Sequence, residues 1–189
     1  MQFIDSRNAI CYFAIVFVEL FRCAGVWILN EREISMALAI GSKAPQFKLF
    51  DTDRKEVSLV DFAGKKLVLV FYPGAFTGVC TKELCSFRDS LADYNTLNAQ
   101  VLAISVDGPF ANKAFKDQNN LSFPVLSDYT RSISLVYGGI HNDFVGLTGY
   151  AVSKRAVFVI DINGTVTYAW ISDNPGVEPP YDEVKKAVE

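Results

Sequence analysis

The hydrophobic and polar positions of residues 36–189 alternate between short apolar runs and stretches of helical spacing. Residues 66–73, KLVLVFYP, form a continuous apolar run that ends at Pro73 and predicts a buried central strand. Residues 101–107, VLAISVD, predict a second buried strand, and residues 123–128, FPVLSD, predict a short third one. These runs indicate the interior of a sheet.

Helices are predicted where apolar residues recur at steps of three or four. From Thr77 onward, Leu84, Phe87, Leu91 and Tyr94 fall on one face of such a helix. Three further helices are expected at residues 109–118, 129–138 and 179–188. The alternation of strands and helices indicates an α/β domain.

Two hairpins are predicted in addition. Residues 41–51 and 56–62 contain short strands joined by the polar turn DTDRK. Residues 156–171, AVFVIDINGTVTYAWI, contain two strands around the turn signal Asn163-Gly164. Because hairpin strands are antiparallel, we expect a mixed central sheet flanked by helices, with an N-terminal β-hairpin.

Residues 1–35 differ in composition from the rest of the chain, and we interpret them as an N-terminal extension of the domain. Residues 9–29 are strongly apolar, but Glu19 and Arg22 interrupt them as a membrane span, and no convincing signal-peptide cleavage site follows. Since Met36 begins a stretch that looks like a natural protein start, we favour a start assigned too early over a signal or anchor, or an extra helix. The expected location is cytoplasmic, with membrane association or export as the alternative if the extension is genuine.

Composition narrows the classes of function. The net charge of −3 argues against nucleic-acid binding, which usually leaves a basic surface. The four cysteines and the one histidine, His141, lack the paired spacing of a zinc site, so no metal is expected, and His141 is predicted to lie in an exposed loop. Cys11 and Cys23 belong to the extension and receive no catalytic role, which leaves Cys80 and Cys85.

The stretch FYPGAFTGVCTKELC, residues 71–85, places Cys80 in the first turn of a helix that directly follows a strand. Free backbone N–H groups and the positive end of the helix dipole lie there, and both favour a thiolate over a thiol. Ligands of open α/β sheets also bind beyond the carboxyl ends of the strands. Cys80 is therefore a candidate nucleophile.

Cys85 follows five positions later, a spacing that does not suit a bond to Cys80. In an intact helix the two Cα atoms would be about 8.6 Å apart on different faces, whereas a disulfide requires about 7 Å or less. Pairing therefore requires the first turn to unwind, which suits a bond that forms and breaks during a cycle. The alternative is that Cys85 is a small buried apolar residue.

Residues 73–80, PGAFTGVC, match the signature P-x-x-x-T-x-x-C, and with this pattern the chain resembles the peroxiredoxins. A second cysteine five residues on is similar to the Q-type peroxiredoxins, also called bacterioferritin-comigratory-protein-like. The resemblance runs from Ala37 to Glu189, includes SVDGPFANKAFK, LSFPVLSDY and KRAVFVIDINGTV, and leaves out residues 1–35. It implies a thioredoxin-like fold.

The resemblance also implies roles for five residues around the thiol. Cys80 would be the peroxidatic cysteine, which attacks a peroxide oxygen and becomes a sulfenic acid. Thr77 would hydrogen-bond the thiolate and the substrate oxygens, and Pro73 would shield the pocket from water. Arg155 would stabilise the thiolate and the charge on the leaving oxygen, and Glu83 would help to hold that arginine.

Cys85 is then the candidate resolving cysteine, which would condense with the sulfenic acid to an intramolecular disulfide before over-oxidation. The implied substrates are hydrogen peroxide and organic hydroperoxides, and thioredoxin or a similar dithiol reductase would recycle the enzyme. No metal or organic cofactor is required, and the expected assembly is a monomer or a homodimer.

Simpler explanations exist for single residues. Taken alone, Pro73 would end a strand, Thr77 would cap a helix, Glu83 would be a first-turn acid and Arg155 a surface charge. The combination of Pro73, Thr77 and Cys80 at this spacing favours the peroxidase.

A one-cysteine peroxidase resolved by an external thiol and a holdase chaperone on the same fold remain alternatives. The spacing of the thiols argues against a thioredoxin-class disulfide exchanger, which usually carries C-x-x-C. Phe76 and Trp170 are expected in the core or in the lining of the pocket.

Overall fold

The computed structural model of the chain describes residues 38–189. Our interpretations of residues 1–35 as an extension and of Met36 as the natural start concern residues outside that range. Of the helices within residues 38–189, none combines the length and the apolar character that a membrane crossing requires.

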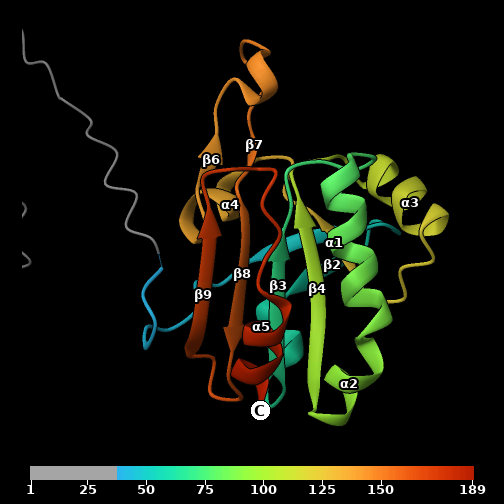
Figure 1. The fold of residues 1–189 in the computed structure, drawn as a ribbon. Coiled ribbons are helices and arrows are strands. Elements are labelled where there is room, and N and C mark those ends of the chain that lie inside the picture. The colour runs from blue at the N-terminus through green and yellow to red at the C-terminus, as the bar shows by residue number, and fades with distance from the viewer. Residues whose placement is uncertain (1–37) are drawn as a thin grey trace, which may run out of the picture. The chain divides into compact units, whose positions relative to one another are not determined.

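A seven-stranded mixed sheet forms the centre of the domain (Figure 1). In spatial order its strands are β2 (Glu56–Ser58), β1 (Lys48–Asp51), β5 (Val125–Ser127), β4 (Ala99–Ser105), β3 (Lys66–Phe71), β8 (Arg155–Ile160) and β9 (Val166–Ser172). Strands β3, β4 and β5 are parallel, whereas β1 and β8 run antiparallel to β5 and β3. The two predicted hairpins, β1–β2 and β8–β9, form the two edges of this sheet.

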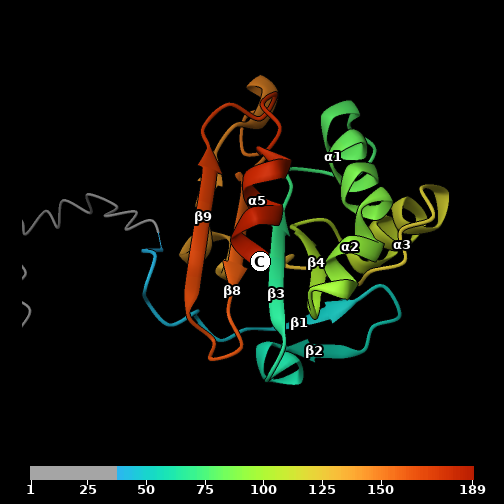
Figure 2. The ribbon, with the colours of Figure 1, turned by 60° about the horizontal axis from the view of Figure 1, so that its bottom comes forward.

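Helices cover both faces of the sheet (Figure 1 and Figure 2). Packed on one face are α1 (Gly78–Asp89), α2 (Leu91–Thr96), α3 (Pro109–Gln118) and α5 (Tyr181–Val188), and on the other are α4 (Ser132–Tyr137) and the 3-10 turn η1 (Leu59–Phe62). Side chains alternate along β3, so Val68 and Val70 enter the first layer while Leu67 and Leu69 enter the second. The apolar run is therefore buried on both sides, as predicted.

Two elements on the chain's first half differ from the prediction. The single helix expected from the apolar spacing is divided at Ser90, so that α1 and α2 are separate. The strand expected within residues 56–62 stops at Ser58. The backbone N–H of Ser58 donates a hydrogen bond to the Asp61 carboxylate (2.7 Å), and this bond turns the chain into η1.

The segment after β5 also differs. Helix α4 covers only part of residues 129–138, because the Asp128 carboxylate accepts a hydrogen bond from the Ser134 backbone N–H (2.6 Å) and fixes a turn in front of the helix. The prediction of an exposed loop at His141 is wrong. His141 is half-buried in the two-residue strand β6 (Ile140–His141), which pairs with β7 (Val152–Ser153).

Candidate active site

Cys80 lies where the chain passes from β3 into α1. Beyond the last residue of β3, the buried Tyr72 and Pro73 lead into a loop in which Phe76 adopts a left-handed backbone conformation, with φ 62°. This conformation is uncommon for residues other than glycine. The Phe76 side chain is 53% exposed and so is not part of the core, one of the two places expected for it, while Trp170 is partly buried against the core. Cys80 follows in the first turn of α1 and is 1% exposed.

Strand β8 brings Arg155 to the same edge of the sheet. Because β8 is antiparallel to β3, the last residue of β3, Phe71, pairs with Ala156. Arg155 therefore lies beside the carboxyl end of β3. Its Nη2 atom is 3.3 Å from the Sγ atom of Cys80, and its side chain is 1% exposed rather than a surface charge.

The Arg155 guanidinium is held by two further partners. Nη1 donates a hydrogen bond to Oε2 of Glu83, and the backbone oxygen of Pro175 accepts hydrogen bonds from Nη2 (2.7 Å) and Nε (3.3 Å). These bonds fix the plane of the guanidinium and direct one of its donors at the sulfur. A fixed cation in such a buried place stabilises a thiolate at Cys80.

Glu83 is completely buried in α1, beyond the first turn in which a dipole-favoured acid would lie. Its Oε1 atom has no hydrogen-bond partner among the described residues. Burial raises the pKa of the Glu83 carboxyl to about 8, and the positive charge of Arg155 opposes this shift. When Glu83 is protonated, the positive charge of Arg155 is balanced by no carboxylate and acts fully on Cys80. When Glu83 is ionised, its negative charge partly neutralises that of Arg155.

Thr77 and Pro73 belong to the loop before the thiol. Thr77 occupies the N-cap position of α1, but its hydroxyl donates to the backbone oxygen of Gly74 (3.0 Å) instead of capping the helix or reaching Cys80. Because a hydroxyl has a single proton, Thr77 offers a substrate only its acceptor lone pairs while this bond is in place. Pro73 is buried at the start of the loop.

Cys85 does not meet Cys80. Both are free thiols, and α1 is unbroken between them, so they lie on different faces of one helix. Cys85 is half-buried, and its Sγ atom is 3.9 Å from Oδ1 of Asn119, the residue after α3. The structure thus brings Cys80, Arg155 and Glu83 together and leaves Cys85 apart.

Asp107 is a side chain of this region that the sequence reasoning missed. Its Oδ2 atom accepts hydrogen bonds from the backbone N–H of Ala75 (2.7 Å) and from the Ser105 hydroxyl (3.2 Å), which anchors the loop in front of Cys80. A signal was available, because Asp107 follows β4 and the parallel strands β3 and β4 end at the same edge of the sheet.

Tyr150 was missed as well. It lies in the segment between β6 and β7, which contains the short η2 (Phe144–Gly146) and projects from the end of the sheet where α1 begins (Figure 1). The Tyr150 hydroxyl lies close to the loop at Gly74, since a Cβ atom added to this glycine would be 3.8 Å from the hydroxyl oxygen. The same Cβ atom would be 3.8 Å from Cγ2 of Thr77. Burial raises the pKa of Tyr150, and the negative groups of Asp107 and Cys80 add to the shift, so the phenol stays protonated. No sequence pattern singles it out.

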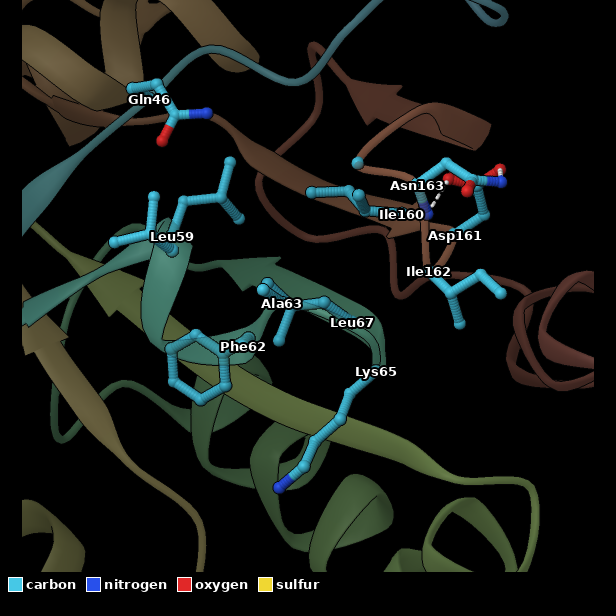
Figure 3. Close-up of a pocket in the computed structure, with 12 residues that line it drawn as sticks. Gln46, Leu59, Phe62, Ala63, Lys65, Leu67, Ile160, Asp161, Ile162 and Asn163 are labelled. Carbon is cyan, nitrogen blue, oxygen red and sulfur yellow. Dashed lines mark hydrogen bonds between the residues drawn. The ribbon is translucent and has the colours of Figure 1, made fainter.

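A pocket of about 180 Å³ lies at the other end of β3 from Cys80 (Figure 3). Leu59, Phe62 and Ile160 form apolar parts of its wall, and the Asp161 carboxylate is already bonded to the N–H of Asn163 in its own turn (2.9 Å). No thiol lines it, so it does not serve the chemistry of Cys80. Across residues 38–189, no three His, Cys, Asp or Glu side chains are grouped so that they could hold a metal ion.

Known proteins are similar to this chain in sequence and in fold. Residues 40–169 match the sequence model of the AhpC/TSA family. The chain is 40% identical over 133 residues to a Mycobacterium tuberculosis protein provisionally named a peroxiredoxin. The aligned region covers 70% of this chain and 84% of that one. It is 36% identical over 149 residues to the mitochondrial thioredoxin-dependent peroxide reductase of Bos taurus, over 74% of this chain and 56% of that one. Among solved structures, it is similar to peroxiredoxin Q of Xanthomonas campestris, with a TM-score of 0.66 and 25% identity over 75% of this chain and 89% of that chain.

Proposed function

The chain belongs to the AhpC/TSA family and is a thiol-dependent peroxidase with a thioredoxin-like fold, and we propose that Cys80 is the cysteine that reacts with the peroxide. The observation that carries this assignment is the contact of 3.3 Å between Nη2 of Arg155 and Sγ of Cys80, in a place where both side chains are 1% exposed. The other described thiol, Cys85, has the neutral amide of Asn119 as its hydrogen-bond partner instead.

In the first step the Cys80 thiolate attacks one oxygen of the hydroperoxide. A bond forms between sulfur and that oxygen, the O–O bond breaks, and the other oxygen leaves with the electron pair and takes up a proton as water or an alcohol. Sulfur is oxidised to a sulfenic acid and the peroxide is reduced. Arg155 stabilises the negative charge that develops on the leaving oxygen, and the free lone pairs of Thr77 accept a hydrogen bond from the substrate.

In the second step Cys85 attacks the sulfur of the sulfenic acid. The S–S bond forms, the S–O bond breaks, and the oxygen leaves as water after taking up a proton. Because α1 is unbroken between the two cysteines, its first turns must unwind before the sulfur atoms can meet.

A dithiol protein of the thioredoxin type then reduces the disulfide by thiol–disulfide exchange. The support for this reductant is the name of the bovine relative, a thioredoxin-dependent peroxide reductase. Hydrogen peroxide and organic hydroperoxides are the proposed substrates.

The test uses full-length chains in which Cys11 and Cys23 are replaced by Ser, so that only two thiols remain. After one equivalent of hydrogen peroxide, mass spectrometry should find a Cys80–Cys85 disulfide in this parent and a Cys80 sulfenic acid in its Cys85→Ser variant. Cys80→Ser should consume no peroxide with thioredoxin and its reductase as the electron source.

Other results would change the assignment in defined ways. A sulfenic acid that persists at Cys80 in both the parent and Cys85→Ser would favour the one-cysteine peroxidase resolved by an external thiol. A reduced Cys80 in both, or peroxide consumption that survives Cys80→Ser, would refute the role of Cys80.

A further inference from the structure

Asn119 connects α1 to α3, which lie side by side (Figure 1 and Figure 2). Its Oδ1 atom accepts a hydrogen bond from the thiol of Cys85 (3.9 Å), and its backbone oxygen accepts one from Nη1 of Arg88 (2.7 Å). Its own Nδ2 group donates to the backbone oxygen of Phe115 (2.9 Å), which fixes the orientation of the amide. Asn119 therefore contacts α1 at two residues, Cys85 and Arg88.

A second contact joins α3 to the chain in front of α1. The ring of Phe76 packs against the completely buried ring of Phe115, with centroids 5.3 Å apart in an edge-on arrangement. The residues that must rearrange for a disulfide run from this loop to Cys85. They are thus held at both ends, by Phe115 in the last turn of α3 and by Asn119 directly after it. Unwinding has to release the contact at Cys85 in particular, since that side chain must change face.

The contact of Arg88 with Asn119 lies on the far side of Cys85 from Cys80. It joins the second half of α1 to α3, so that half can stay attached if the first half unwinds. Breaking the bond between Cys85 and Oδ1 of Asn119 therefore frees the thiol without detaching the whole helix.

We propose that Asn119 is a positioning residue that holds Cys85 in the intact helix, and that loss of this contact is a step in disulfide formation. The inference rests on the proposed function of the two cysteines. A Cys80 sulfenic acid has two fates, which are attack by Cys85 with loss of water and attack on a second peroxide, which oxidises it to a sulfinic acid. A firmer hold on Cys85 shifts the outcome toward the sulfinic acid, and a weaker hold shifts it toward the disulfide.

The test follows both oxidation steps by stopped flow in the two-thiol parent and in Asn119→Ala. The thiol is a weak donor, so removal of its acceptor should speed disulfide formation by about twofold to fivefold. The rate at which Cys80 reacts with the first equivalent of peroxide should not change. With excess peroxide, mass spectrometry should find less sulfinic acid at Cys80 than in the parent.

Two further variants separate positioning from a general loosening of the fold. Asn119→Asp keeps an acceptor for Cys85 but loses the donor to Phe115, so the inference expects no acceleration of disulfide formation, whereas a purely structural role expects the same acceleration as in Asn119→Ala. Gln118→Ala changes the exposed neighbour of Asn119 and should behave as the parent. Thermal melts report whether each variant is folded.

Disulfide formation at the parental rate in Asn119→Ala would overturn the role of Asn119, and so would equal acceleration in Asn119→Asp. In both cases the parent still forms the Cys80–Cys85 bond, so the proposed function stands. If the parent forms no such bond, the resolving role of Cys85 fails first, and the inference fails with it.

Discussion

Nη2 of Arg155 lies 3.3 Å from Sγ of Cys80, although the two residues are 75 positions apart in the chain. The antiparallel register of β3 and β8 creates this contact, because it sets the first residue of β8 just beyond the last residue of β3. The same guanidinium is bound to Glu83, so one positive charge serves a thiol and a carboxyl. We therefore expect the reactivity of the thiol to depend on what else Arg155 binds.

Replacement of Arg155 by Gln should slow the reaction of Cys80 with hydrogen peroxide by on the order of 100-fold, the usual effect of losing one preorganised donor at a developing negative charge. Stopped-flow measurement of Cys80 oxidation gives this rate directly. Arg155→Lys keeps a positive charge but loses the rigid fork that contacts three partners at once, so its rate should be intermediate. A parental rate in folded Arg155→Gln would show that the contact has no part in the chemistry.

The features that the sequence predicted are those set by short local patterns of residues. Within β3 the residues from Leu67 to Phe71 are all apolar, and Asn163-Gly164 is a turn signal, so strand and hairpin were predictable. The position of Cys80 in the first turn of α1 followed from the strand that ends before it. The interruption at Ser90 was not predictable, because the apolar face continues across it into α2.

The candidate site depends on contacts between distant segments, and these left weaker signals. Burial of Arg155 results from strand register, and its role came from family resemblance alone. Pro175 contributes a backbone oxygen, which no side-chain pattern reveals. Tyr150 and Asn119 reach the site through packing of a loop and a helix end, and neither type of residue marks such a position in a sequence.

Glu83 should make the stability of the protein depend on pH. Its pKa rises from an ordinary 4.5 to about 8 in the folded state because the carboxyl is buried. Between these values the unfolded chain has lost the proton and the folded chain keeps it, so the unfolded state binds fewer protons and stability falls as the pH rises. The contribution is complete below the lower value and is lost as the pH approaches the higher one.

Glu83→Gln removes this titration while it keeps the shape of the side chain. Thermal melts at about pH 5 and about pH 8 should therefore show a smaller fall in Tm for Glu83→Gln than for the parent. An equal fall in both proteins would mean that Glu83 is ionised beside Arg155 throughout this range.

Tyr150 should restrict access to Cys80. Its hydroxyl approaches the loop at Gly74, so we expect the ring to narrow the approach to the thiol from the segment between β6 and β7. Tyr150→Ala should lower the KM for cumene hydroperoxide by about threefold or more and leave the KM for hydrogen peroxide unchanged. Tyr150→Phe keeps the ring and serves as the control, with both KM values near those of the parent. A higher KM for cumene hydroperoxide in Tyr150→Ala would show instead that the ring is a contact surface for the substrate.

Asp107 should act on Cys80 through the loop that precedes it. Asp107→Ala leaves the half-buried N–H of Ala75 without its acceptor, which should cost about 1–2 kcal/mol in the free energy of unfolding, measured with urea. The loosened loop should also slow Cys80 oxidation several-fold, because Thr77 and the first turn of α1 follow directly from it. Asp107→Asn keeps an oxygen acceptor and should restore most of both quantities. If Asp107→Asn is as impaired as Asp107→Ala, the negative charge of Asp107 matters rather than its hydrogen bond to the loop.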